Sequence, residues 1–361
     1  MSAISSSTAP VTPVAINTLV PTLSAVRTNC HISDARHAAD YTLCVYLLKM
    51  REYFRWENNI PFNSALQQEA VSDWLTKREQ HWDTLDQEVF EQVPVAGGSY
   101  DPFDATTINA NLNDLGYVYS SGYGRNMKPL FFLGELEKHQ QYDGYTLLVS
   151  GREYARDLTA PPAMSQGNTI YVRRESLRRM LWEKIEEWRW NKPVNAMQNA
   201  LACYDFDNDH EAALEAMTEN ELDAVILHEI GEVMAGAQLG EEWEALLVSL
   251  PQSKAELMVR SVRDHLADAL STLPGLLQSA NTASLHFYIA NLANMRKALF
   301  PKLLSAYATW TATGSTRDLE NTVQEARTHW QSVAAGVLEL FREQGPDCQH
   351  AVVALIEDNA L

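Results

Sequence analysis

The sequence is poor in cysteine and lacks a long apolar run. Its four cysteines, Cys30, Cys44, Cys203 and Cys348, lie far apart and show none of the paired spacings of a zinc ribbon. Secreted disulfide scaffolds are much richer in cysteine, so we expect reduced thiols here. A membrane-spanning helix needs about 18 consecutive apolar residues. The sequence has no such run, and it therefore predicts a protein with no membrane partner.

Basic residues are also scarce. The chain has 28 Lys and Arg residues against 47 Asp and Glu residues, which gives a formal net charge of −19. A strongly negative protein is repelled by phosphate backbones and by anionic membrane surfaces. We therefore expect no nucleic acid as a partner and a small-molecule substrate instead. The sequence leaves a homodimer open.

The amino-terminal segment lacks the pattern of a secretory signal. No basic residue precedes Arg27, and Pro10, Pro13 and Pro21 interrupt the segment. A signal peptide begins with positive charge and continues with an apolar stretch. We therefore expect residues 1–28 to form a flexible arm and the protein to reside in the cytoplasm.

Helical periodicity dominates most of the remaining chain. In residues 29–57, Ser33 or Asp34 can cap a helix that runs to about Glu57. Leu43, Leu47, Met50 and Phe54 recur there at steps of three or four, which predicts a wide apolar stripe. Similar patterns continue from Glu175 to the end. The later helices are expected at about 219–239, 241–249, 253–272, 282–299, 302–312 and 316–344.

Residues 94–174 interrupt this helical pattern. The part up to about Pro129 is rich in Gly, Asp, Asn and Tyr, which indicates a long ordered loop, and a short helix is expected around 130–140. Three strand-like segments follow, at 145–150, 153–158 and 169–174. The predicted fold class is mainly α. Residues 29–361 are expected to form a single large helical domain, a bundle with a small β-hairpin or three-stranded insertion at about 94–174.

The stretch ELDAVILHEIGEVMAGAQL, residues 221–239, is apolar but carries His228, Glu229 and Glu232. An isolated charge in apolar surroundings costs several kcal/mol unless it is paired or metal-bound. At about 3.6 residues per turn, Glu232 shares a helix face with either of the other two. This face is the candidate site. A polar bridge between packed helices explains it equally well.

Three other predicted helices carry the same residue types. Imidazole and carboxylate groups suit iron, manganese or zinc, and packed helices present such ligands at every third or fourth position. The expected metal ligands are His37, His228, Glu232, His265, Asp268 and His286. Further ligands, or acids that orient the histidines, are Asp34, Glu229 and Asp264.

In architecture and ligand type, this set resembles the ferritin-like and heme-oxygenase-like di-metal carboxylate proteins. The Glu-x-x-His pair of ferritin-like proteins is absent, since Asp34-x-x-His37 is a shortened version and His228-x-x-x-Glu232 has the reverse order. The resemblance implies dioxygen chemistry in a helical bundle. Our leading hypothesis is a metal-dependent oxidoreductase or oxygenase with one or two iron or manganese ions, and zinc is less favoured.

Two alternatives stay open. The segment ILHEIGE, residues 226–232, is similar to the signature of HD-type phosphohydrolases, with Glu229 in place of the aspartate. That resemblance implies a metal-dependent phosphohydrolase with His37 and Asp268 as outer ligands. The other alternative is a non-catalytic helical scaffold or binding protein whose His–acid pairs are hydrogen bonds between helices.

The segments 29–57, LHEIGEVMAG (227–236) and VRDHLADALSTLP (262–274) together resemble a bacterial family of unassigned activity. This likeness covers most of the chain. It implies no particular chemistry, so the predicted function depends on the candidate site residues themselves.

Overall fold

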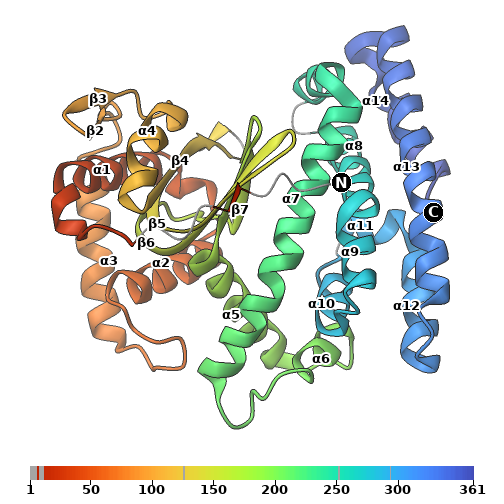
Figure 1. The fold of residues 1–361 in the computed structure, drawn as a ribbon, viewed down its shortest axis with the longest axis horizontal. Coiled ribbons are helices and arrows are strands. Elements are labelled where there is room, and N and C mark those ends of the chain that lie inside the picture. Colours follow the sequence, from red (N-terminus) through yellow and green to blue (C-terminus); the bar gives the residue numbers. More distant parts are fainter. Residues whose placement is uncertain (1–5, 8–11, 125–126, 251–252, 293) are drawn as a thin grey trace. The chain divides into compact units, whose positions relative to one another are not determined.

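The computed structural model describes residues 6–7, 12–124, 127–250, 253–292 and 294–361. The chain divides into two compact units. We call Met1–Ile185 with His210–Thr218 the sheet unit, and Glu186–Asp209 with Glu219–Leu361 the helical unit. Figure 1 shows the elements of both units.

A six-stranded sheet forms the centre of the sheet unit. Its strand order is β1-β5-β6-β8-β7, and β4 pairs with β5. All neighbours are antiparallel except β6 and β8. Gly144, with φ of +92°, closes the β5–β6 hairpin in a backbone conformation that glycine adopts without strain. The strands are β1 (Ser6–Ser7), β4 (Tyr117–Tyr123), β5 (Pro129–Tyr142), β6 (Tyr145–Arg156), β7 (Ala163–Gln166) and β8 (Thr169–Arg173).

Helices and a small hairpin cover one face of this sheet. Val26 and Cys30 of α1 pack with Phe131 and Leu133 of β5 and with Ala155 of β6 in one apolar core. The small hairpin and α4 join the same core (Figure 1). The helices and hairpin strands of the sheet unit are α1 (Val20–His37), α2 (Leu43–Glu57), α3 (Gln68–Trp82), β2 (Val93–Val95), β3 (Gly98–Tyr100), α4 (Ala105–Leu112) and the part of α5 (Arg174–Asn191) up to Ile185.

The helical unit contains α6, the long helix α7 from Glu219 onward, and the shorter helices that follow it along the chain. Its apolar core includes Trp243, Val262, Trp330 and Val337. A π-helical turn continues α8, and such turns are often found at functional sites. The elements are α6 (Ala196–Leu201), α7 (His210–Ser249), α8 (Lys254–Ala267), the π-helical turn (Asp268–Thr272), α9 (Leu273–Gln278), α10 (Thr282–Asn291), α11 (Asn294–Leu299), α12 (Pro301–Thr313), α13 (Arg317–Gln344) and α14 (Gln349–Asp358). Among the described residues, no helix is long and apolar enough to cross a membrane.

The predicted fold class is wrong in its β content. The sheet unit is a substantial mixed α/β structure, not a helical bundle with a small insertion. The expected helix around 130–140 is part of β5, and the expected loop before Pro129 contains α4 and β4. Residues 117–122 and 129–134 are buried without interruption. A strand buried on both faces loses the alternation of apolar and polar residues that identifies strands in a sequence.

The helix expected from a cap at Ser33 or Asp34 to about Glu57 is also interrupted. It is two helices, because α1 begins at Val20 and ends at His37, and α2 begins at Leu43. Tyr41, with ψ of 146°, is extended and ends the short 3-10 turn between them. The expectations for 302–312 and 316–344 are confirmed by α12 and α13.

Candidate functional site

Asp34 and His37 are the candidate ligands that belong to the sheet unit. The buried Asp34 carboxylate lies 2.8 Å from Lys128 Nζ and accepts the backbone N–H of Leu158 at 2.9 and 3.0 Å. His37 Nδ1 lies 2.9 Å from a carboxylate oxygen of Asp40. Each of the two residues therefore has a partner within its own unit.

Asp268 is the centre of a polar network in the helical unit. Its carboxylate is 1% exposed and begins the π-helical turn. One oxygen lies 2.8 Å from His228 Nδ1 and accepts the Thr272 hydroxyl at 2.8 Å. The other accepts the Tyr288 hydroxyl at 2.7 Å and a guanidinium N–H of Arg296. This carboxylate thus joins α7, α10 and α11, and its burial is fully compensated.

The charges of this network shift the pKa values of Asp268 and His228. Burial by itself would raise the pKa of Asp268, but Arg296 and His228 outweigh it and hold this pKa below the ordinary range. Burial would lower the pKa of His228, yet the Asp268 carboxylate dominates and raises it to about 9. His228 is therefore an imidazolium at neutral pH. Its side chain keeps 32% of its surface exposed.

Three more candidate acids lie around His228. Glu232 forms an ion pair with Arg263 at 2.8 Å. Asp264 lies 3.8 Å from Arg296 Nε, and burial raises the pKa of this carboxyl to about 6. Glu229 is close enough for its charge to contribute to the raised pKa of His228. Glu232 and Asp264 thus pair with Arg263 and Arg296, although both carboxylates lie close enough to His228 to interact with its charge.

The remaining two candidate histidines contact aromatic side chains. His265 Nε2 donates to the backbone oxygen of Arg296 at 3.0 Å, and its ring stacks on Trp330 with centroids 4.8 Å apart. Burial lowers the pKa of His265 to about 3, so its imidazole is neutral. His286 Nδ1 lies 2.8 Å from the Tyr307 hydroxyl, and its ring lies 4.8 Å from that of Trp310.

The candidate residues do not form one metal-binding cluster. Across the part of the chain that the structure describes, no group of three or more His, Cys, Asp or Glu side chains is arranged to hold a metal ion. The arrangement brings together His228, Glu232, Asp264 and Asp268, but it fits a metal poorly because Arg263 and Arg296 already neutralise these acids. The iron or manganese site stays a prediction.

The sheet unit contains a pocket that the sequence did not indicate. It has a volume of about 340 Å³ and lies where α1, the end of α2 and β6 meet. We call it the arginine pocket. Its lining residues are Arg27, His31, Tyr53, Trp56, Glu57, Asn59, Arg152, Glu153 and Tyr154.

Arg27 and Arg152 line this pocket, and both are exposed. Arg27 Nε donates to the backbone oxygen of Tyr154 at 2.9 Å, and Arg152 lies 3.4 Å from the Asn59 side-chain oxygen. The guanidinium of Arg156 lies behind the lining, 4.6 Å from the centre of the Trp56 ring. Within the described chain, no carboxylate forms an ion pair with any of the three arginines.

The acidic groups of the arginine pocket already have partners. Glu57 is bound by Arg78 at 2.6 Å and by the Trp74 indole N–H at 2.6 Å. The buried Glu153 carboxylate is bound by Arg173 at 2.6 Å and by the Ser176 hydroxyl at 2.7 Å. The pocket therefore has a surplus of positive charge.

Arg78 also contacts His31 from α1. Its guanidinium lies 2.8 Å from His31 Nε2. Burial, followed by the charge of Arg78, lowers the pKa of His31 to about 3. This imidazole is therefore neutral and offers a hydrogen-bonding group but no charge.

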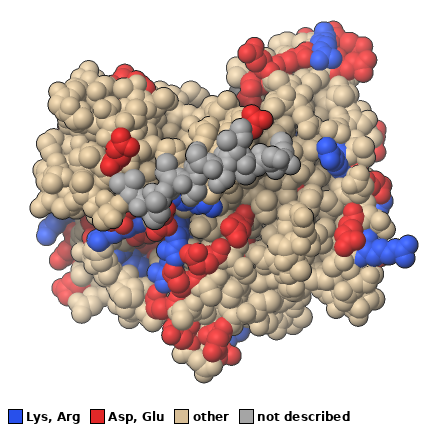
Figure 2. Space-filling view, viewed as in Figure 1, with Lys and Arg blue, Asp and Glu red and all other residues tan. Residues whose placement is uncertain are grey.

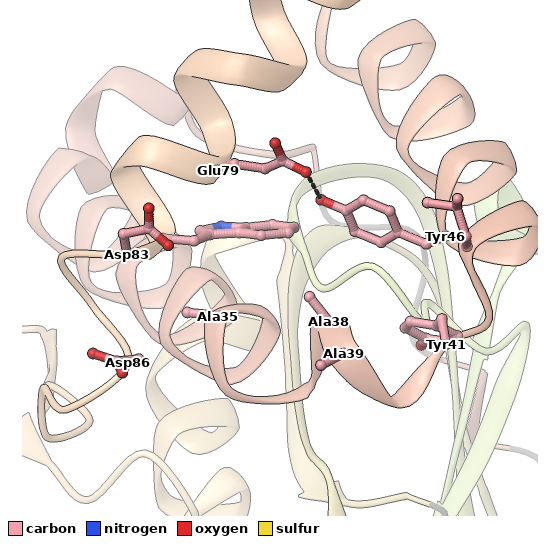
Figure 3. Close-up of a pocket in the computed structure, with 10 residues that line it drawn as sticks. Ala35, Ala38, Ala39, Tyr41, Tyr46, Glu79, Asp83 and Asp86 are labelled. Carbon is pink, nitrogen blue, oxygen red and sulfur yellow. Dashed lines mark hydrogen bonds between the residues drawn. The ribbon is translucent and has the colours of Figure 1, made fainter.

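A second concavity of the sheet unit has the opposite charge. Figure 3 shows it between α1, α2 and the end of α3, with a volume of about 610 Å³. Glu79, Asp83 and Asp86 line it and are exposed, and the Tyr46 hydroxyl donates to Glu79 at 2.9 Å. Ala35, near the end of α1, and Ala38, in the 3-10 turn that follows it, form part of its wall. We call it the acidic pocket, and it offers an internal comparison for the arginine pocket.

Comparison with family models gives two adjacent matches. The amino-terminal domain model of a family of unknown function (DUF6866) matches residues 22–173, and the carboxy-terminal domain model of the same family matches residues 178–359. The boundary follows β8, near the start of α5. No curated protein and no solved structure matches the chain. The expected resemblance to a family of unassigned activity agrees with these matches.

Proposed function

The chain belongs to the family of unknown function DUF6866, and from this premise we propose that its amino-terminal domain binds a small anionic molecule in the arginine pocket. One observation carries the proposal. Arg27 and Arg152 line this pocket, the buried Arg156 lies against the Trp56 ring of its lining, and none of the three has an ion-pair partner among the described residues. The chain has a net charge of −19, so carboxylates are abundant, and Figure 2 shows them at many places on one face. The charges of Glu153 and Glu175 act on Arg156, and that of Glu175 acts on Arg152, but neither carboxylate forms an ion pair with these arginines. Arginines without an ion-pair partner in such a protein favour an anionic ligand.

The geometry suits anion recognition. A guanidinium has five N–H donors in a fixed plane and binds a carboxylate or phosphate through two parallel hydrogen bonds. Arg27 and Arg152 approach the pocket from different elements, α1 and β6, so they can hold one anion from two sides. The volume of about 340 Å³ fits a small ligand, since pockets for small molecules begin at about 300 Å³.

This proposal is closest to the binding-protein alternative drawn from the sequence. The metal-dependent oxidoreductase and the HD-type phosphohydrolase stay predictions. Both would need Glu232 or Asp268 as metal ligands, and these carboxylates are bound to Arg263 and Arg296. A metal would have to displace an arginine, which makes these two functions less favoured by the geometry.

Titration calorimetry with inorganic phosphate at low salt tests the proposal. We expect the wild-type protein to bind phosphate and the variants Arg27→Gln and Arg152→Gln to bind about tenfold more weakly each, because each loses a charge-assisted hydrogen bond. Arg260→Gln is the matched control. Arg260 is 55% exposed on α8, pairs with Glu256 and is not among the residues that line the pocket.

Two further readouts make this test decisive. Circular dichroism checks the fold of each variant, and we expect it to be kept, since Arg27 and Arg152 are exposed and their loss opens no cavity. Binding should also weaken as salt is raised, because counterions compete for the arginines. Equal affinity in the wild type and in the Arg27→Gln/Arg152→Gln double variant would overturn the proposal.

A further inference from the structure

The lining of the arginine pocket also indicates what kind of anion it holds. On the premise of the proposed anion binding, we infer that the ligand is a phosphomonoester that carries an aromatic ring and has about the size of a mononucleotide. Volume, charge and the aromatic lining each support this ligand class, and they are separate observations.

The pocket is larger than a bare inorganic anion requires. Its volume is about 340 Å³, roughly ten times the volume that one water molecule occupies in the liquid. A phosphate held between Arg27 and Arg152 would fill a small part of that space. The ligand must therefore carry a further group that packs against the remaining lining.

That lining is aromatic. Tyr53, Trp56 and Tyr154 all face the pocket, and the rings of Tyr53 and Trp56 lie 5.3 Å apart. Arg156 covers the Trp56 ring at 4.6 Å, and Arg152 covers the Tyr154 ring at 5.1 Å. A planar ring packs well in such a cluster, because aromatic and guanidinium groups stack on the faces of bases and similar rings.

The charge favours a phosphomonoester over a carboxylate. Arg27 and Arg152 line the pocket, and Arg156 lies against its Trp56 ring. None of the three has an ion-pair partner among the described residues, and a carboxylate would supply only a single negative charge to them. A phosphomonoester carries about −1.5 to −2 at pH 7 and has three acceptor oxygens. It therefore matches Arg27 and Arg152 at the pocket and the field of the buried Arg156 behind it.

The acidic side of the lining can bind the uncharged part of the ligand. Both Glu57 oxygens accept hydrogen bonds from Arg78, which balances their charge, yet each carboxylate oxygen accepts more than one hydrogen bond. Asn59 lies beside Arg152 and offers both a donor and an acceptor. Hydroxyl or amino groups between the phosphate and the ring would find partners there.

Nothing in this inference requires a polymer. The arginines are confined to one cavity, and a nucleic acid would need an extended basic surface to follow its backbone. The net charge of −19 opposes such a surface. The inferred ligand is therefore a free small molecule.

Calorimetric titration with four probes tests the ligand class: inorganic phosphate, ribose 5-phosphate, adenosine 5′-monophosphate (AMP) and adenosine. We expect AMP to bind about five- to a hundredfold more tightly than ribose 5-phosphate, because the ring adds stacking to the phosphate contacts. Adenosine should bind weakly, since it lacks the charge that the arginines recognise.

Variants then assign the ring contact. Trp56→Leu should remove most of the advantage of AMP over ribose 5-phosphate and leave phosphate binding largely unchanged. Trp190→Leu is the matched control, because Trp190 is 85% exposed and does not line the pocket. Tyr154→Leu is a second variant of the lining, in case loss of Trp56 disturbs the stacked Arg156 and the fold.

The outcomes separate this inference from the proposed function. If phosphate binds through Arg27 and Arg152 but AMP binds no more tightly than ribose 5-phosphate, the ligand class is wrong and anion binding stands. If none of the four probes binds to the wild-type protein, both the anion site and the ligand class are overturned. The comparison of AMP with ribose 5-phosphate uses the wild type alone, so it decides the matter even if a variant fails to fold.

Discussion

At the scale of single residues, the histidines and acids form separate pairs instead of one shared cluster. His228 binds Asp268, His265 binds the backbone of Arg296, and His37 binds Asp40. The sequence correctly placed His228 and Asp268 in apolar helices, where a charge needs a partner. It did not reveal that Arg296 is a main partner of Asp268, because the two residues lie on different helices.

Protonation of His228 should make stability depend on pH. Its pKa is about 9 in the folded protein against an ordinary value of 6.5, so its contribution is fully present below pH 6.5 and is lost as the pH rises through 9. We therefore expect the free energy of unfolding to fall between pH 6.5 and 9 by more in the wild type than in His228→Gln. Urea unfolding at pH 6, 7.5 and 9.5 measures this difference.

The control for this prediction is His286→Gln. Burial lowers the pKa of His286, so its removal cannot reproduce a loss of stability at high pH. Identical pH slopes in the wild type and in His228→Gln would show that the His228–Asp268 contact does not stabilise the folded protein.

At the scale of elements, α7 and α8 approach closely where small residues meet. A Cβ atom placed on Gly231 would lie 2.3 Å from the backbone oxygen of Ala267, closer than real contacts allow. Gly231 lies about one turn after His228 on α7, and Ala267 directly precedes Asp268 in the sequence. Gly231 is therefore needed for the distance between helices that lets the His228–Asp268 hydrogen bond form.

Two glycines of α7 should respond in opposite directions to alanine. Gly231→Ala should destabilise the protein by about 1–3 kcal/mol, because the methyl group forces the two backbones apart. Gly236→Ala should be neutral or stabilise by about 0.5–1 kcal/mol, since its nearest neighbour is an arginine side-chain atom at 4.0 Å and alanine favours helix. Thermal unfolding of both variants measures the effects. A similar loss of stability in the two variants would contradict this account.

Among the elements, the helices of the carboxy-terminal half were the most predictable. α13 has a clear apolar stripe with Leu319, Val323, Trp330 and Val337 buried, so its period is visible in the sequence. β5 was not recognised, because Pro129–Gly134 are buried throughout and show no period of two.

At the scale of the whole molecule, each unit has its own apolar core. Trp243 and Trp330 belong to the core of the helical unit, whereas Phe131 and Ile108 belong to a core of the sheet unit. The two family matches divide the chain at nearly the same place as the start of α5. Separate cores predict that a local loss of stability stays largely within one unit.

Asp268→Asn tests this separation. The variant leaves the Arg296 charge without its main partner, and breaking such a pair costs roughly 3 kcal/mol. We expect faster hydrogen exchange in α7, α8 and α10, measured by mass spectrometry, and little change in β4, β5 and β6. Phosphate binding in the arginine pocket should persist, and its loss would show that the two units depend on each other.

The sequence by itself determined the acidic character of the chain, the absence of a long apolar run, the helices of the carboxy-terminal half and the need of His228 for a partner. These properties follow from composition and from local periodicity, which records whether a face is buried. The tertiary structure decided what covers each face. It built the sheet, paired Asp268 with Arg296, and brought Arg27, Trp56 and Arg152 to one pocket. Such contacts join residues far apart in the chain, so no local pattern contains them.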